Sequence, residues 1–147
     1  MQAKAYLDFN GRAEEAIEFY KQAVGAEVIT FMRFKDGPKM GASEGCQPPP
    51  GIDEKVMHAC LKIGETEVMA SDGRCTGTPN FEGFSLALTA GDTGEAERLF
   101  KALGEGGEIR MPMGETFFSP GFGMVADKFG VSWMVVTLPA EAKAAAE

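Results

Sequence analysis

The feature that most constrains the fold of this chain is an internal repeat. The run EAIEFYK at residues 15–21 recurs 80 residues later as EAERLFK at residues 95–101. Both runs keep the glutamate, the alanine, an aromatic residue and the final lysine, and a glycine follows soon after, at Gly25 and Gly104. Each half then has a strand pattern and ends in a strand–turn–strand pattern. A repeat of this kind is typical of a duplicated structural unit, so we predict two similar modules.

Each module is predicted to hold one helix and four strands in the order βαβββ. Apolar residues at helical spacing indicate the helices, and alternating or continuous apolar runs indicate the strands. Asn10 or Gly11 is expected to cap the first helix, and Asp92 or Thr93 the second. The fold class is therefore α+β, with duplicated βαβββ modules and curved mixed sheets that each pack one helix. The expected bounds are one domain over 1–147 with modules over 3–72 and 82–138, strands over 3–9, 28–34, 54–63, 67–72, 84–90, 108–113, 122–126 and 131–136, and helices over 13–24 and 93–103.

The charge balance excludes two classes of partner. The chain has 14 basic and 22 acidic residues, a net charge of −8. Nucleic acids and anionic membrane surfaces are bound through clusters of basic residues, so neither partner is expected. No apolar run approaches the roughly 20 residues that a membrane-spanning helix needs. No signal-peptide pattern follows Met1, which predicts a cytoplasmic protein.

The three cysteines, Cys46, Cys60 and Cys75, do not predict a disulfide framework or a zinc site. Their number is odd and no CxxC spacing occurs. Cys60 lies in an apolar strand pattern, where a packed thiol is expected. Cys46 and Cys75 lie in predicted loops without a neighbour that would activate a thiolate.

Three blocks of the sequence resemble a known family. They are FNGRAEEAIEFYKQAVGAEV from residue 9, VMHACLKIGETEVMASD from residue 56, and GETFFSPGFGMVADKFGVSWMV from residue 114. Together they are similar to the vicinal-oxygen-chelate superfamily, which includes glyoxalase I, extradiol dioxygenases and the bleomycin- and fosfomycin-resistance proteins. Within it the chain is most similar to the PhnB-like subgroup, also labelled 3-demethylubiquinone methyltransferase-like. The resemblance implies a homodimer, but no reaction, and no G-x-G-x-x-G cofactor loop follows a strand.

The resemblance also implies where a metal would be held. Metal enzymes of the superfamily use His, Glu or Gln from the first and last strand of each module. In this chain the corresponding positions are Ala5, Val68, Ser85 and Met134, with Glu67 replacing Val68 if the register slips by one. These side chains do not suit a hard divalent ion. We therefore expect neither a metal site nor another cofactor; should a metal bind, the residues to consider are Glu67, His58, Asp72 and Glu115.

An apolar pocket for a small organic molecule is the expected site. Alternation predicts that Ser132, Met134 and Val136 face the concave side of the sheet, and that Val131, Trp133 and Val135 face the helix. The candidates for acid–base catalysis are His58 and Asp72. The expected ligand-binding residues, which in an alternative reading only fill the core, are Leu7, Phe9, His58, Cys60, Phe118, Phe122 and Met134.

Three functions stay open from the sequence. The first is binding of a small organic ligand without the usual metal. The second is an enzyme, of lyase, isomerase or dioxygenase type, that uses His58 or a metal held by other residues. The third is an interaction module in which the proline-rich stretch at residues 39–53 contacts a partner; this stretch could equally be a lid or a plain loop.

Overall fold

The computed structural model describes residues 1–36, 51–73 and 79–138. The chain divides into two compact units, Met1–Pro79 and Asn80–Glu147. The predictions for Cys46, Cys75 and most of the stretch at 39–53 fall outside the described residues. Within them, no helix has the length and apolar character that crossing a membrane requires.

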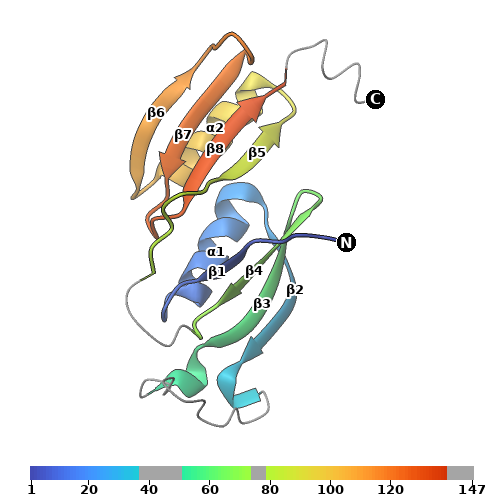
Figure 1. Ribbon diagram of the computed structural model, residues 1–147, viewed down its shortest axis with the longest axis vertical. Helices are drawn as coiled ribbons and strands as arrows, with labels where there is room; N and C mark the ends of the chain where they lie inside the picture. Colours follow the sequence, from blue (N-terminus) through green and yellow to red (C-terminus); the bar gives the residue numbers. More distant parts are fainter. Residues whose placement is uncertain (37–50, 74–78, 139–147) are drawn as a thin grey trace. The chain divides into compact units, whose positions relative to one another are not determined.

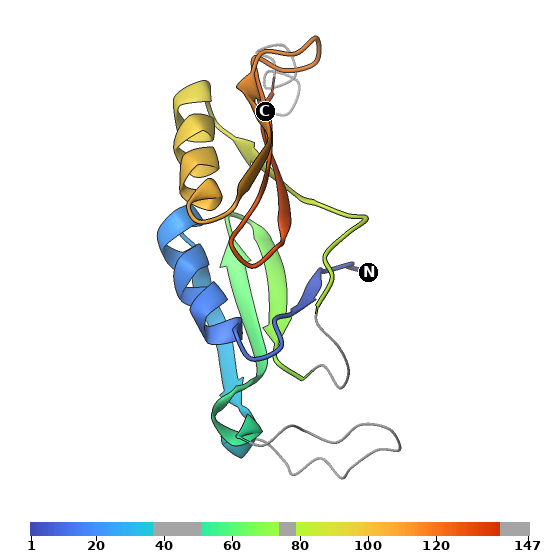
Figure 2. The ribbon, with the colours of Figure 1, turned by 90° about the vertical axis from the view of Figure 1, so that its left-hand side faces the viewer.

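The first unit is a four-stranded mixed sheet with one helix against it (Figures 1 and 2). The strand order is β1-β4-β3-β2, in which β1 runs parallel to β4 and the other neighbours are antiparallel. Short 3-10 turns, η1 (Phe34–Asp36) and η2 (Ile52–Glu54), flank the segment that is not described. The elements are β1 (Tyr6–Asp8), α1 (Ala13–Val24), β2 (Glu27–Arg33), β3 (Val56–Ile63) and β4 (Thr66–Ser71).

The second unit repeats this arrangement. Its strand order is β5-β8-β7-β6, again with one parallel pair, β5 with β8. The predicted α+β fold of two βαβββ modules is thereby confirmed. The elements are β5 (Leu86–Ala90), α2 (Thr93–Gly104), β6 (Glu108–Gly114), β7 (Gly121–Ala126) and β8 (Ser132–Thr137).

Figure 2 shows the helix of each unit lying along one face of its own sheet, and among the described residues no α-helix covers the other face. In the second unit, Trp133 and Val135 are buried, whereas Met134 and Val136 are half-exposed. Val135 pairs with Gly123, and a Cβ on Gly123 would lie 2.8 Å from the Phe100 ring of α2. The α2 face thus carries Trp133 and Val135, as the alternation predicted. Below, the opposite face of each sheet is called its open face.

The start of α1 differs from the prediction. Arg12 occupies the N-cap position, and no side chain of the cap residue bonds to the helix. Asn10 and Gly11 are not the cap; instead the carboxylate of Asp72 accepts hydrogen bonds from the backbone N–H groups of Gly11 and Ala13. For α2 the prediction is confirmed, because the Asp92 side chain accepts from the N–H of Glu95 at 2.7 Å.

Candidate functional site

The open face of the first sheet gathers sulfur and aromatic side chains. Register pairs Tyr6 with Met69, Met69 with Cys60, and Met32 with His58, so these five side chains share one face. The rings of Tyr6 and His58 lie 5.9 Å apart between centroids, tilted by 30°. Tyr6 is 52% exposed and the other four are half-exposed, so a ligand can reach them.

The open face of the second sheet is also rich in methionine and phenylalanine. Met111 pairs with Met124, and Met124 pairs with Met134, which places a row of three thioethers across β6, β7 and β8. Beside it, the Phe118 ring lies 5.1 Å from the rings of both Phe117 and Phe122, edge-on in each case. Phe118 is 44% exposed and Phe122 is buried beneath it. The two units therefore present open faces of similar chemistry.

Two predicted ligand-binding residues lie in the core. Leu7 and Phe9 are only 2% and 4% exposed. Leu7 pairs with Ala70 on the α1 side of the sheet, and the Phe9 ring lies 6.3 Å from that of Tyr20 on α1. The structure thus brings His58 and Cys60 together on one open face and Phe118, Phe122 and Met134 on the other, but it separates Leu7 and Phe9 from both.

Three of the four superfamily metal positions change. Val68 is buried on the α1 side, because it pairs with Leu61. The open-face counterpart of Met134 is Met69, since each lies opposite the first strand of its sheet, at Ala87 and Tyr6. The count failed because a two-residue turn joins β3 to β4, whereas five residues join β7 to β8. By the same pairing, Tyr6 and Ala87 replace Ala5 and Ser85 as the first-strand positions, because they lie opposite Met69 and Met134.

The side chains at these positions do not fit a hard divalent ion. Tyr6, Met69, Ala87 and Met134 offer a phenol, two thioethers and a methyl group, and Ser85 next to β5 adds only a hydroxyl. Over residues 1–36, 51–73 and 79–138, no three His, Cys, Asp or Glu side chains form a group that could hold a metal. These positions therefore offer no ligand set that matches the metal chemistry of the superfamily.

The two acid–base candidates do not meet. Asp72 is buried, and its carboxylate accepts from the backbone N–H groups of Gly11, Ala13 and Val56 at 2.7, 3.0 and 3.1 Å. It therefore faces the start of α1, whereas His58 lies on the open face against Tyr6. Three backbone donors thus engage both oxygens of this carboxylate, which indicates a structural cap rather than a base.

Glu67 is held by an ion pair. Its carboxylate bonds the ammonium of Lys4. This hydrogen bond is the main reason that the pKa of Glu67 is lowered from its ordinary value of 4.5 and the pKa of Lys4 is raised from 10.5. Glu67 is thus engaged at the edge of the open face.

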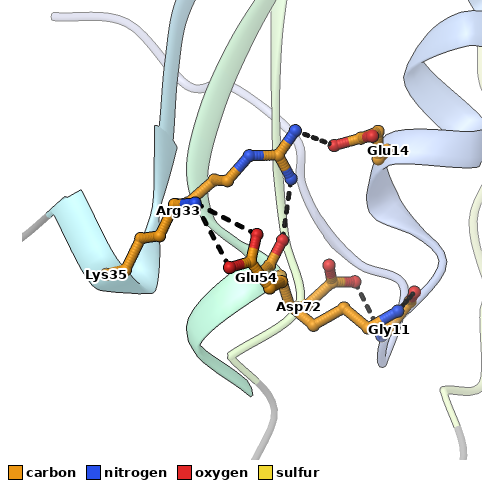
Figure 3. A pocket seen from close by; sticks show the side chains of 7 residues that line it. Gly11, Glu14, Arg33, Lys35, Glu54 and Asp72 are labelled. Carbon is orange, nitrogen blue, oxygen red and sulfur yellow. Dashed lines mark hydrogen bonds and ion pairs between the residues drawn. The ribbon is translucent and has the colours of Figure 1, made fainter. Parts of the chain in front are cut away.

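A polar pocket of about 490 Å³ lies where α1, η1 and η2 meet (Figure 3). Arg33 pairs with Glu14 and donates to the Glu54 carbonyl at 2.7 Å, and Lys35 pairs with Glu54 at 3.1 Å. Lys55 donates to the Gly11 carbonyl at 3.0 Å. Each of these three cations thus already has an oxygen partner. We interpret the pocket as a structural feature that links α1 to η1 and η2. No motif in the sequence marks it, because its residues come from four separate segments.

The chain is similar to known proteins in both sequence and structure. The family model described as 3-demethylubiquinone-9 3-methyltransferase matches residues 2–136. The chain is 36% identical to Protein YjdN of Escherichia coli (strain K12) over 138 residues, 92% of this chain and 94% of that one. The structure of protein PA1353 from Pseudomonas aeruginosa is 39% identical, with a TM-score of 0.80 and coverage of 94% and 98%.

More distant structures extend the likeness. A putative 3-demethylubiquinone-9 3-methyltransferase, PhnB protein, from Bacillus cereus is 28% identical, with a TM-score of 0.71 and coverage of 93% and 99%. The fosfomycin resistance protein FosX from Listeria monocytogenes is 10% identical, with a TM-score of 0.62 over 96% of this chain and 95% of that one. The last likeness shows the fold alone.

Proposed function

Because the chain belongs to the 3-demethylubiquinone-9 3-methyltransferase family, the PhnB-like group of the vicinal-oxygen-chelate superfamily, we propose that it binds a small, flat, largely apolar organic molecule on its open sheet faces. The binding does not use the hard-metal site of the superfamily. The observation that carries this proposal is the exposure of methionine and aromatic side chains on those faces.

The placement of methionine supports the proposal most strongly. Residues 1–36, 51–73 and 79–138 contain eight methionines, and none belongs to the buried core. Met69, Met124 and Met134 instead lie half-exposed on open faces. A contiguous patch of exposed apolar side chains marks a binding surface, and the flexible thioether of methionine adapts to ligands of varied shape.

The aromatic rings favour a flat ligand. Phe118 stands over Phe122 with its face partly open, and Tyr6 stacks loosely beside His58. Ring-on-ring contacts contribute about 0.5–1.5 kcal/mol beyond the burial of apolar area. A conjugated ring system that covers Phe118 and the row of Met111, Met124 and Met134 would gain both the ring contact and the burial of apolar area.

The test is a ligand titration with a matched control. A panel of neutral and cationic polycyclic aromatic compounds is screened by thermal shift, and hits are titrated by fluorescence. Phe118→Ala should weaken binding by about twofold to tenfold, the loss of one ring contact. Ile109→Ala is the control, because Ile109 is 57% exposed but pairs with Val125 and so lies on the α2 side. Equal affinities of the two variants would contradict the proposal.

An enzymatic function is the alternative, and the position of His58 favours it. The imidazole is half-exposed on the open face, next to Cys60 and Tyr6. A reaction would need only this one general base or acid. Turnover of a bound hit that His58→Gln abolishes, with binding retained, would establish the enzyme; binding without turnover supports the primary proposal.

We also propose a homodimer in the cytoplasm. β2 is an edge strand of its sheet and exposes Val28, Ile29 and Phe31, and pairing with a second copy is one way in which such an edge is covered. Cys60 is a free thiol, which fits a reducing compartment. Sedimentation of the wild type and of Ile29→Lys tests the first claim, and cell fractionation tests the second.

A further inference from the structure

We propose that the open face of the first sheet binds a soft monovalent metal ion, Cu(I) or Ag(I), through Cys60, His58 and Met69, with Met32 beside them. This site differs in place and chemistry from the hard-metal positions of the superfamily. It also goes beyond the binding of an organic ligand.

The sheet register brings the four donors together. Cys60 lies directly opposite Met69 on β4, and His58 lies directly opposite Met32 on β2. Directly opposed residues have Cβ atoms about 4.5–5.5 Å apart. His58 and Cys60 are two residues apart on β3, so their side chains emerge on one face about 7 Å apart along the strand. Side chains at these spacings can converge on one ion between β3 and its two neighbours.

The donor set selects the metal. The four residues offer one thiolate, one imidazole and two thioethers, all from one sheet face. Thiolate and thioether ligands select Cu(I) over the hard ions Mg²⁺, Ca²⁺ and Mn²⁺, which take oxygen. Among these four residues no carboxylate competes, and Glu67 at the edge of the face is occupied by Lys4.

The surroundings suit a metal-binding thiol. Cys60 is free and half-exposed, so an ion can reach it. The Tyr6 ring lies against the imidazole of His58 and limits its orientations.

The experiment is a competition titration with the metal alone. The background protein is Cys46→Ser/Cys75→Ser, which removes the two other thiols of the chain. Cu(I) is added under a reductant against a coloured Cu(I) chelator, and Ag(I) is measured in parallel. We expect one equivalent per chain, with a thiolate-to-copper absorption band in the near ultraviolet.

Variants in the same background identify the ligands. Cys60→Ser should lose the absorption band and weaken binding at least about tenfold, and Met69→Leu should weaken it by about threefold to tenfold while keeping the fold. Met113→Leu is the matched control, because Met113 is also a half-exposed methionine but lies on β6 of the second sheet, with its sulfur beside Gly123. Its affinity should equal that of the background protein.

Cu(I) affinity that is unchanged by Cys60→Ser, or lowered as much by Met113→Leu as by Met69→Leu, would show that this face is not the site. Circular dichroism of each variant establishes that the fold is retained. Because Phe118 takes no part in the metal site, the aromatic-ligand titration stands or fails independently.

Discussion

The buried carboxylate of Asp72, at the end of β4, accepts a hydrogen bond from the backbone N–H of Ala13, the first residue of α1, at 3.0 Å. A residue 59 positions further along the chain thus performs the capping that the residues before the helix do not supply. This bond ties the helix to the sheet from which the open face is built.

Replacement of Asp72 should therefore lower stability rather than remove catalysis. Asp72→Ala leaves three backbone donors unpaired in the interior, and we expect a loss of about 2–4 kcal/mol in the free energy of unfolding. Urea denaturation followed by circular dichroism measures it. Asp53→Ala, at an exposed position of η2, should change stability by less than about 0.5 kcal/mol. Similar losses for both variants would refute the capping role.

The second unit has a comparable buried aspartate. Asp127 accepts from the N–H groups of Phe129 and Val131 and from the indole of Trp133 at 2.8 Å. Trp133→Phe breaks the last bond and removes volume from the core, so we expect a loss of about 2–3 kcal/mol. Thermal unfolding by circular dichroism is the measurement. An unchanged unfolding temperature would mean that the bond contributes nothing to the β7–β8 hairpin.

Gly123 is expected to tolerate no side chain. A Cβ there would lie 2.6 Å from the sulfur of Met113 and 2.8 Å from the Phe100 ring. Gly123→Ala should cost about 1–3 kcal/mol because α2 or Met113 must shift. At Gly114, also in the second unit, the nearest atom to an added Cβ is 4.0 Å away, so Gly114→Ala is the control. Comparable urea midpoints for the two variants would contradict the close packing of α2 on β7.

The Lys4–Glu67 ion pair predicts a pH dependence with two limits. Because the pKa of Glu67 is lowered, its contribution to the stability of the folded state is present above pH 4.5 and is lost as the pH falls below that value. Because the pKa of Lys4 is raised, its contribution to stability is present below pH 10.5 and is lost as the pH rises further. The unfolding temperature of Glu67→Gln should thus fall below that of the wild type at neutral pH and converge with it under strong acid. Glu65→Gln serves as the control, and a gap that persists in acid would refute the assignment.

The sequence predicted the elements well because helix and strand periods depend on local residues. Both helices and the final hairpin lie within a few residues of their predicted bounds. It failed where the answer depends on a long-range contact or on one residue of register. Asp72 contacts α1 only in the folded protein, because 59 residues separate it from Ala13. The turns before β4 and β8 differ in length, so counting from the turn selected Val68, which faces α1, instead of Met69. Alternation also does not say which face is open, so Leu7 and Phe9 were expected to bind ligand although they lie in the core.

The central claim is that ligands bind the open faces, and methionine methyl NMR tests it most directly. With methyl-labelled methionine and a saturating aromatic hit, the signals of Met69, Met124 or Met134 should shift. The signal of Met113, whose sulfur lies beside Gly123 on the α2 side of the second sheet, should stay in place. A shift confined to Met113, or an unperturbed spectrum at saturation, would contradict the account.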